Sequence, residues 1–324
     1  MNNATGGALI VFGEALIDAF PEQRIVGGAP LNVARVTASL GCAPLLLTRI
    51  GADHDAQLVR AELQRFGMDQ SGVQTDPMHA TGQVRVEIGP TGHQFHILPN
   101  QAYDYINHDL AELAVTGYLQ QAGSTRLTVF YFGTLAQRQS TSHKTLINLL
   151  TSHAGINYLD LNLRNGQYTE NEIRTSLFHA DILKVNEDEL QTLLEAFHPE
   201  AGQLGMDLFN LEICTAFFDA MHHLLALFEL SAMIVTLGAQ GYMYLNAQGV
   251  RVNGWQAHPK PIQVVDTVGC GDAFSSVFLT GMLHDWPLAA TLQRAHDFAG
   301  SVCTIRGAVS DDLNFYRNWQ SRWN

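Results

Sequence analysis

Residues 264–283, VVDTVGCGDAFSSVFLTGML, combine an apolar strand pattern, a turn that contains Gly269 and Gly271, and an apolar segment with helical spacing. Two glycines let the backbone turn sharply and leave successive N–H groups uncovered by side chains. The helix that follows adds its own unpaired N–H groups and the positive end of its dipole. This stretch therefore predicts an anion hole, which holds a phosphate or a developing negative charge.

Asp272 follows this turn directly. A carboxylate beside an anion hole can take the proton from a hydroxyl as that hydroxyl attacks phosphorus. The alternative is an ordinary strand–turn–helix in which Asp272 only caps the helix. A single G-x-G-D motif favours the capping alternative, so the rest of the chain has to decide between the two.

Four further segments accompany DTVGCGD, and all five resemble, in family order, the signatures of the ribokinase (PfkB) family of carbohydrate kinases. The segments are GGAPLNVARVTASLG (27–41), LDLNLRNGQY (159–168), KVNEDEL (184–190) and VTLGAQGYMY (235–244). The first has the form typical of the fructokinase branch. The resemblance runs from residue 9 to about residue 310, and it implies a ribokinase-like α/β core with a β lid over the sugar.

The alternation of strand and helix patterns after residue 127 also predicts an α/β fold, a doubly wound and mostly parallel sheet with helices on both faces. A longer helical region is expected over 187–229, with an insert around HPEAGQLGMD. Earlier in the chain, GQVRVEI and HQFHIL alternate with period two around a Gly-Pro-Thr-Gly turn, which predicts a hairpin.

With residues 14–24, this hairpin would form a small sheet that projects from the main body. No repeat or low-complexity linker separates the two parts, so we expect one interleaved unit. The expected core comprises residues 1–13, 25–79 and 102–324, and the expected lid comprises residues 14–24 and 80–101.

The composition argues against several functions. The 324 residues carry a net charge of −13 at pH 7, which disfavours nucleic acid and anionic membranes as partners. The first eight residues lack the pattern of a signal peptide, and no apolar run is long enough to span a membrane. The cysteines are widely spaced without a C-x-x-C pair, so we expect reduced thiols in a cytoplasmic protein. They are Cys42, Cys214, Cys270 and Cys303.

The resemblance implies that Asp272 is the general base of phosphoryl transfer from ATP to a sugar hydroxyl. The backbone N–H groups of Gly269, Cys270 and Gly271 would then stabilise the charge that develops. Cys270 stands where the family usually has Ala, and we assign its thiol no chemical role.

The sugar contacts implied by the resemblance come from the N-terminal part of the chain. The carboxylate of Asp18 can accept two sugar hydroxyls, while Gly27 and Gly28 let the backbone approach the ring. The amide of Asn32 can donate and accept, although helix capping is an alternative role.

Two further candidates, Asn162 and Arg164, follow an expected strand at its carboxyl end, where open α/β sheets bind ligands. The guanidinium of Arg164 can pair with phosphate oxygens or with a polar substrate, and both possibilities stay open.

For the nucleotide, the resemblance implies that Asn186 and Glu189 organise Mg²⁺ and the phosphates, Glu189 through water. It also implies that the triphosphate and the ribose lie on a loop formed by Thr236, Gly238 and Gly241. A monovalent-cation loop, suited to K⁺, is matched by Asp266, Val268, Arg306, Gly307 and Ser310.

The leading hypothesis is an ATP-dependent sugar kinase with fructose as the acceptor. Family members that phosphorylate 2-keto-3-deoxygluconate carry basic and aromatic residues just after the second lid strand. The corresponding run here, HILPNQAYDYI, contains no Arg or Lys, so the resemblance implies a neutral sugar. A 2-keto-3-deoxygluconate kinase, a nucleoside kinase and a catalytically inactive sugar or nucleotide sensor are the alternatives. Family members often dimerise through their lids, so a homodimer of this kind is a further expectation.

Overall fold

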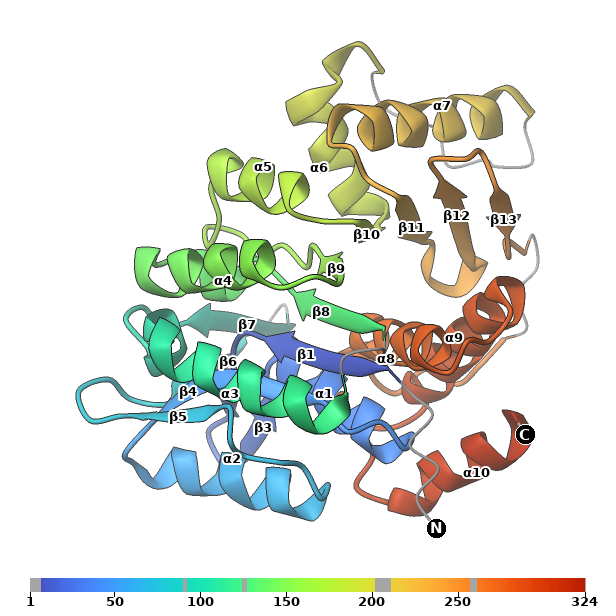
Figure 1. The fold of residues 1–324 in the computed structure, drawn as a ribbon. Coiled ribbons are helices and arrows are strands. Elements are labelled where there is room, and N and C mark those ends of the chain that lie inside the picture. The colour runs from blue at the N-terminus through green and yellow to red at the C-terminus, as the bar shows by residue number, and fades with distance from the viewer. Residues whose placement is uncertain (1–6, 90–91, 124–126, 202–210, 257–260, 324) are drawn as a thin grey trace.

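The computed structural model describes residues 7–89, 92–123, 127–201, 211–256 and 261–323 (Figure 1). Within these ranges, a nine-stranded sheet has the order β13-β12-β11-β10-β9-β8-β1-β4-β5. Its strands are β1 (Ala8–Phe12), β4 (Leu45–Gly51), β5 (Val73–Asp76), β8 (Thr128–Phe132), β9 (Ile156–Asp160), β10 (Ile182–Asn186), β11 (Ala232–Thr236), β12 (Tyr242–Asn246) and β13 (Arg251–Asn253). Among the strand pairs of this sheet that the structure describes, β11–β12 and β12–β13 alone are antiparallel.

Helices cover both faces of this sheet, as Figure 1 shows. One face carries α3 (His108–Ala122), α4 (Ser140–Ser152), α5 (Glu170–Phe178), α6 (Glu187–Phe197) and α7 (Leu211–Leu227). The other face carries α1 (Ala29–Ser39), α2 (His54–Arg65), α8 (Cys270–Leu283), α9 (Leu288–Val302) and α10 (Leu313–Trp323). The predicted α/β class is confirmed.

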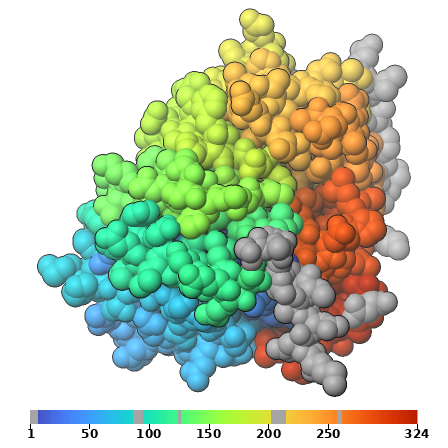
Figure 2. All heavy atoms as spheres, viewed as in Figure 1, coloured from blue at the N-terminus to red at the C-terminus, as the bar shows by residue number. Residues whose placement is uncertain are grey.

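Two hydrophobic cores result, because the side chains of each central strand alternate between the faces. In β1, Ile10 packs into the core under α3 and α4, whereas Leu9 and Val11 pack into the core under α1 and α8. Burial on both faces explains why this strand is apolar throughout. In the space-filling view, the last helices (orange to red) lie against earlier parts of the chain (Figure 2).

The expected helical region 187–229 is divided into α6 and α7. The insert expected around HPEAGQLGMD falls partly on residues 202–210, which lie outside the described residues. Within the described ranges, none of the helices has both the length and the apolar character needed to cross a membrane.

A second sheet of four strands has the order β3-β2-β6-β7. Its strands are β2 (Leu16–Ala19), β3 (Arg24–Gly27), β6 (Gly82–Gly89) and β7 (Gly92–Ile97). The predicted hairpin is confirmed as β6–β7, although residues 90–91 of its turn lie outside the described residues. The sheet is larger than expected, because β3 pairs along β2 and extends it from residue 24 to residue 27. We call β2, β3, β6 and β7 the small sheet.

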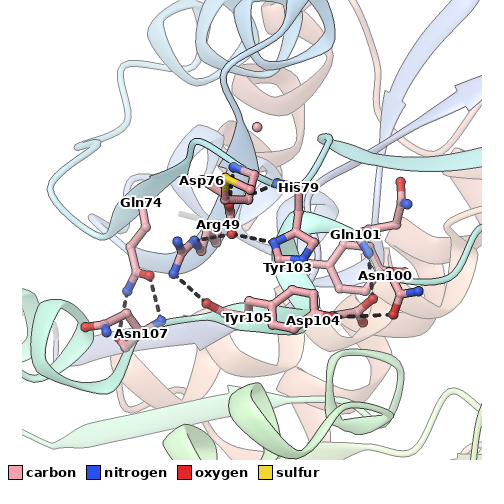
Figure 3. Close-up of polar contacts among 12 residues, drawn as sticks. Arg49, Gln74, Asp76, His79, Asn100, Gln101, Tyr103, Asp104, Tyr105 and Asn107 are labelled. Atoms are coloured by element: carbon pink, nitrogen blue, oxygen red, sulfur yellow. Dashed lines mark hydrogen bonds and ion pairs between the residues drawn. The ribbon is translucent and has the colours of Figure 1, made fainter.

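The chain crosses between the two sheets before β6 and again after β7, and polar contacts join the two crossings (Figure 3). Asp76 lies 2.8 Å from Arg49 Nε and 3.1 Å from His79 Nδ1. Arg49 also donates to the carbonyl oxygen of Tyr105 over 2.7 Å, and the rings of His79 and Tyr105 stack with their centroids 3.8 Å apart. These contacts fix the base of the small sheet against the core.

Candidate active site

The turn before α8 has the geometry of an anion hole. Gly269 is the N-cap residue and has a left-handed φ of 77°, and a Cβ at this position would collide with Ala308. Among the described residues, no side chain caps α8, so the N–H groups of Gly271 and Asp272 stay available to an anion. The expected strand before this turn is not formed: Val264 and Val265 are exposed in an irregular segment.

Asp272 is a buried residue in the first turn of α8. Its Oδ2 accepts a hydrogen bond from Asn32 Nδ2 over 2.8 Å. Because Gly269 is the N-cap residue, the alternative that Asp272 caps the helix is wrong. Burial raises the pKa of Asp272, and Asp160 raises it further, while Asn32 and nearby cations lower it. A carboxylate with a raised pKa is a better proton acceptor than an exposed aspartate.

Asn32 lies inside α1, four residues after the N-cap Gly28. Helix capping is therefore the wrong role for it. Its Oδ1 accepts from Arg35 Nη2 over 2.6 Å, so the amide connects this guanidinium to Asp272. Gly28 has a φ of 108°, and a Cβ there would lie 2.5 Å from the carbonyl oxygen of Glu14. Glycine at position 28 thus lets α1 begin close to Glu14, in the connection between β1 and β2.

Asp18 lies half-buried on β2, in the small sheet. A Cβ on Gly27 would lie 2.9 Å from Asp18 Oδ2, so the glycine leaves room for this carboxylate. Burial raises the pKa of Asp18 to about 6, although Arg164 and Arg35 lower it. The charge of Arg164 therefore reaches the carboxylate on the small sheet.

A pocket lies between α1 and the carboxyl ends of the strands. Its lining consists of Glu14, Ala29, Pro30, Tyr131, Gly133, Thr134, Leu135, Asn162 and Arg164. Asn162 has a positive φ of 45°, which bends the chain after β9. The structure thus brings Asn162 and Arg164 into one pocket with Ala29 and Pro30 at the start of α1.

Sequence reasoning missed Glu14. This residue is buried, and its Oε1 accepts from the backbone N–H of Ala29 over 3.2 Å. Burial raises the pKa of Glu14 to about 7, while Arg164 lowers it and Asp272 raises it. A carboxylate within the apolar run ALIVFGEALIDAF was the available signal, because buried acids are rare without a partner or a function.

Asn186 and Glu189 form a capping box at the start of α6. Asn186 Oδ1 accepts from Glu189 N over 2.9 Å, and Glu189 Oε2 accepts from Asn186 N over 3.0 Å. Glu189 Oε1 accepts from Leu163 N over 2.9 Å, so both of its oxygens hold backbone groups. Burial raises the pKa of Glu189, although Lys184 lowers it. Direct coordination of Mg²⁺ does not fit this arrangement, and contact through water remains a proposal.

The predicted nucleotide loop lies beside this capping box. Thr236 is the register partner of Asn186 in the parallel β10–β11 pair. Gly238 and Gly241 follow with positive φ values of 53° and 115°, and a Cβ on Gly241 would collide with the carbonyl oxygen of Gly254. The structure thus brings together two segments that are 50 residues apart in the sequence (186 and 236).

Some of the residues predicted for the cation loop lie together in the structure, and one of them has other partners. Asp266 Oδ1 accepts from Val268 N and its Oδ2 accepts from Gly307 N, each over 3.0 Å. Arg306 precedes Gly307 in the same segment. Ser310 is turned to other partners, because its N–H donates to Tyr316 OH over 2.9 Å. No cluster of three or more His, Cys, Asp or Glu side chains that could hold a metal ion occurs among the described residues.

The expectation of four reduced cysteines is wrong for one pair. Cys270 and Cys303 form a disulfide, with Cα atoms 6.1 Å apart, while Cys42 and Cys214 are free. The two bonded residues are 33 positions apart in the sequence, so their spacing did not suggest a pair. They meet because α9 packs along α8 and returns the chain to the start of α8.

Lys184 and Asp160 were also missed as candidates. Both are buried, and Lys184 Nζ lies 2.9 Å from Asp160 Oδ1. Each is a charged residue on a strand of the central sheet, where burial of a charge requires a partner, and this was the available signal.

Comparison with known proteins gives relatives along almost the whole chain. Fructokinase-1 of Zea mays is 27% identical over 303 residues, which cover 87% of this chain and 85% of that protein. The fructokinase of Escherichia coli is 26% identical over 286 residues, which cover 84% and 83%.

Solved structures of low sequence identity share the fold. Fructokinase from Xylella fastidiosa with bound ATP has a TM-score of 0.77 at 19% identity and covers 98% of both chains. Fructokinase from Vibrio cholerae O395 with fructose, ADP and calcium has a TM-score of 0.75 at 20% identity and covers 97% of this chain and 99% of that one. Aminoimidazole riboside kinase from Salmonella enterica has a TM-score of 0.73 at 22% identity, with the same coverage.

The family model described as pfkB family carbohydrate kinase matches residues 9–314. This match contains every segment from which the site was built. The chain therefore belongs to the pfkB family of carbohydrate kinases.

Proposed function

We propose that this carbohydrate kinase is an ATP-dependent fructokinase in which Asp272 is the general base and the backbone of residues 269–271 is the anion hole. One observation carries the proposal: a buried carboxylate, fixed by Asn32, lies in the first turn of a helix whose N-terminus no described side chain caps. The fructokinase relatives support fructose as the acceptor.

The geometry supports a division of roles in the transfer step. The hydrogen bond from Asn32 fixes the orientation of Asp272, and burial raises the pKa of the carboxyl group. The sugar hydroxyl gives its proton to Asp272 as its oxygen attacks the γ-phosphorus of ATP. The bond from this phosphorus to the β–γ bridging oxygen breaks, and ADP leaves. The free N–H groups at the start of α8 then stabilise the charge on the phosphoryl oxygens. Mg²⁺ on the phosphates would add further neutralisation, with Glu189 acting through water.

Arg164 lines the pocket beside Glu14, and we infer that it lies within reach of both bound substrates. Its positive charge lowers the pKa values of Glu14, Asp18 and Asp272. These three carboxyl groups belong to the connection after β1, to the small sheet and to α8. Arg164 thereby favours the charged forms of these groups, which can accept hydrogen bonds from the hydroxyls of a neutral sugar.

The surroundings of the second crossing support a neutral sugar. Arg138 approaches this segment and donates to the carbonyl oxygen of Leu98 over 2.7 Å. The guanidinium of Arg138 forms an ion pair with the buried Asp104, whose Oδ1 lies 2.8 Å from Arg138 Nε. A carboxylate on the sugar would have to compete with Asp104 for this cation, which disfavours 2-keto-3-deoxygluconate as a substrate.

A substrate panel tests the proposal. ADP release is measured with fructose, tagatose, ribose, 2-keto-3-deoxygluconate and adenosine, with Asp272→Asn as the matched inactive control. We expect the highest kcat/KM for fructose and loss of turnover in the variant. A higher kcat/KM for the sugar acid or the nucleoside would overturn fructose as the substrate. Binding of sugar and ATP without ADP release would support the sensor alternative.

A further inference from the structure

The buried ion pair of Lys184 and Asp160 lies directly beneath the anion hole. The two residues are register partners on the neighbouring parallel strands β10 and β9. Lys184 Nζ lies 2.9 Å from Asp160 Oδ1 and 3.2 Å from Asp160 Oδ2. Their side chains are only 7% and 1% exposed, so solvent does not screen the interaction.

The ammonium group of Lys184 lies next to Gly271. A Cβ on this residue would lie 3.1 Å from Lys184 Nζ, so the ammonium is packed against the second residue of α8. The N-terminus of a helix carries a partial positive charge, and a cation there is unfavourable. The fold thus concentrates positive charge at the point where the N–H groups of the anion hole lie.

Asp160 fixes the ammonium of Lys184 beside Gly271, and a hydrogen bond from α8 fixes Asp160 in turn. Its Oδ2 accepts from Ser275 Oγ over 2.7 Å, and Ser275 lies on α8, one turn after Asp272. Burial lowers the pKa of Lys184, but Asp160, Glu189 and Asp272 outweigh this effect and raise it above its ordinary value. The side chain is therefore a cation.

A purely structural role does not account for this pair. Two buried charges cost desolvation energy, and apolar residues of similar volume often stabilise a core equally well or better. We propose that Lys184 is a positioning residue for phosphoryl transfer, whose ammonium, held by Asp160 behind Gly271, increases the positive potential of the anion hole and draws the transferring phosphoryl group onto its N–H groups. This inference rests on the proposed role of that anion hole.

The test separates turnover from stability. The double variant Lys184→Met/Asp160→Asn removes both charges together, so neither is left buried and unpaired. Because the lost cation acts through the anion hole, we expect kcat to fall about 10- to 100-fold, with both KM values within about threefold of wild type. Its thermal midpoint should stay close to that of the wild type and above that of Lys184→Met, which leaves Asp160 unpaired.

Ser275→Ala is the matched control. It removes a hydrogen bond to Asp160 and keeps both charges. We expect a lower thermal midpoint but a kcat within about threefold of wild type, because one hydrogen bond of stability is lost and no charge. A calorimetric measurement with ADP, aluminium fluoride and sugar adds a readout of the transition state: the double variant should bind this mimic at least about tenfold more weakly and bind ADP alone normally.

Wild-type kcat in the double variant, or an equal loss of kcat in Ser275→Ala, would show that the pair is only structural and would overturn the proposal. The ratios are measured with whichever sugar of the panel the wild type phosphorylates best. If fructose fails as the substrate, the proposed function changes and the comparison still decides the role of Lys184.

Discussion

The region proposed for phosphoryl transfer and the region proposed for sugar binding differ in how completely their side chains are held in place before any ligand binds. At the phosphoryl-transfer end, Asp272, Asp160 and Lys184 are buried, and each has a hydrogen-bond partner within 2.9 Å. At the sugar end, Asp18 is half-buried, and its carboxylate has no hydrogen-bond partner among the described residues. We infer that the groups proposed for catalysis are preorganised, whereas the proposed sugar site would be completed by the substrate.

The two ends also differ in what carries them. Asp272, the proposed base, lies on α8, which packs against α1 and α9. Asp18 lies on the small sheet, which the contacts around Asp76 and Tyr105 fix at its base (Figure 3). We propose that the small sheet is the lid over the sugar. A lid that moves about this fixed base would exclude water from the transfer step.

Among the predictions that test this contrast, the largest effect is a loss of kcat in the region proposed for phosphoryl transfer. Gly269→Ala puts a Cβ into Ala308 at a left-handed φ of 77°, so the turn has to shift. Since a small misplacement of reacting groups can cost about 100-fold, we expect kcat to fall by at least about that factor. Steady-state kinetics measures it. The control is Gly300→Ala on α9, where a Cβ would meet no atom within 4 Å. An equal loss in both variants would refute the special role of the turn.

The next largest effect is a rise in the sugar KM in the region proposed for sugar binding. Asp18→Ala removes a carboxylate that is proposed to accept sugar hydroxyls only. Because a hydrogen bond to a charged group contributes about 1.5–3 kcal/mol, we expect the sugar KM to rise more than tenfold. ATP affinity, measured by calorimetry on the free enzyme, should be unchanged. An equal loss of ATP affinity would place Asp18 in the wrong site.

A smaller effect is expected from pH. The pKa of Asp18 is about 6, so its charged form, the hydrogen-bond acceptor, is lost as the pH falls through that value. The sugar KM should therefore rise severalfold between pH 7 and pH 5.5, because the fraction of charged Asp18 falls. Asp18→Asn should lose this dependence, and Glu14→Gln separates the contribution of Glu14, whose pKa is about 7. A pH dependence that persists in Asp18→Asn would assign the titration to another group.

The subtlest effect is on dynamics. Sugar should slow amide hydrogen exchange in β2, β6 and β7, whereas ATP alone should slow it less, because the sugar completes the contacts of the small sheet. Strands β8 and β9 of the core are the internal reference. If sugar leaves the exchange of β6 and β7 unchanged, the small sheet is a fixed scaffold and the proposed closure fails.

Much of the fold could be predicted because its signals are local. The residues of DTVGCGD predict a tight turn at a helix start, and the period-two runs predict the β6–β7 hairpin. The β3 strand could not be placed, because Arg24–Gly27 gains its place only by pairing with β2. The expected strand before Gly269 was also wrong, because Val264 and Val265 are exposed and belong to neither sheet.

The candidate site was harder to predict, because the same sequence pattern can mark a ligand-binding motif or a helix cap. N-x-x-E in KVNEDEL is similar to a family motif and is also the pattern of a capping box, and the structure shows the capping box. Lys184 and Asp160 are 24 residues apart and become partners only when β9 and β10 pair. Cys270 and Cys303 likewise meet only through the packing of α8 and α9.

The measurement that tests the central claim most directly compares turnover and binding in Asp272→Asn. Asparagine keeps the shape of the side chain and removes its ability to accept a proton. We predict that kcat falls by at least about 100-fold, the usual contribution of a positioned base, while calorimetric affinities for sugar and ATP stay near those of the wild type. Near-normal turnover in the folded variant, with both ligands bound, would contradict the account and remove Asp272 from the mechanism.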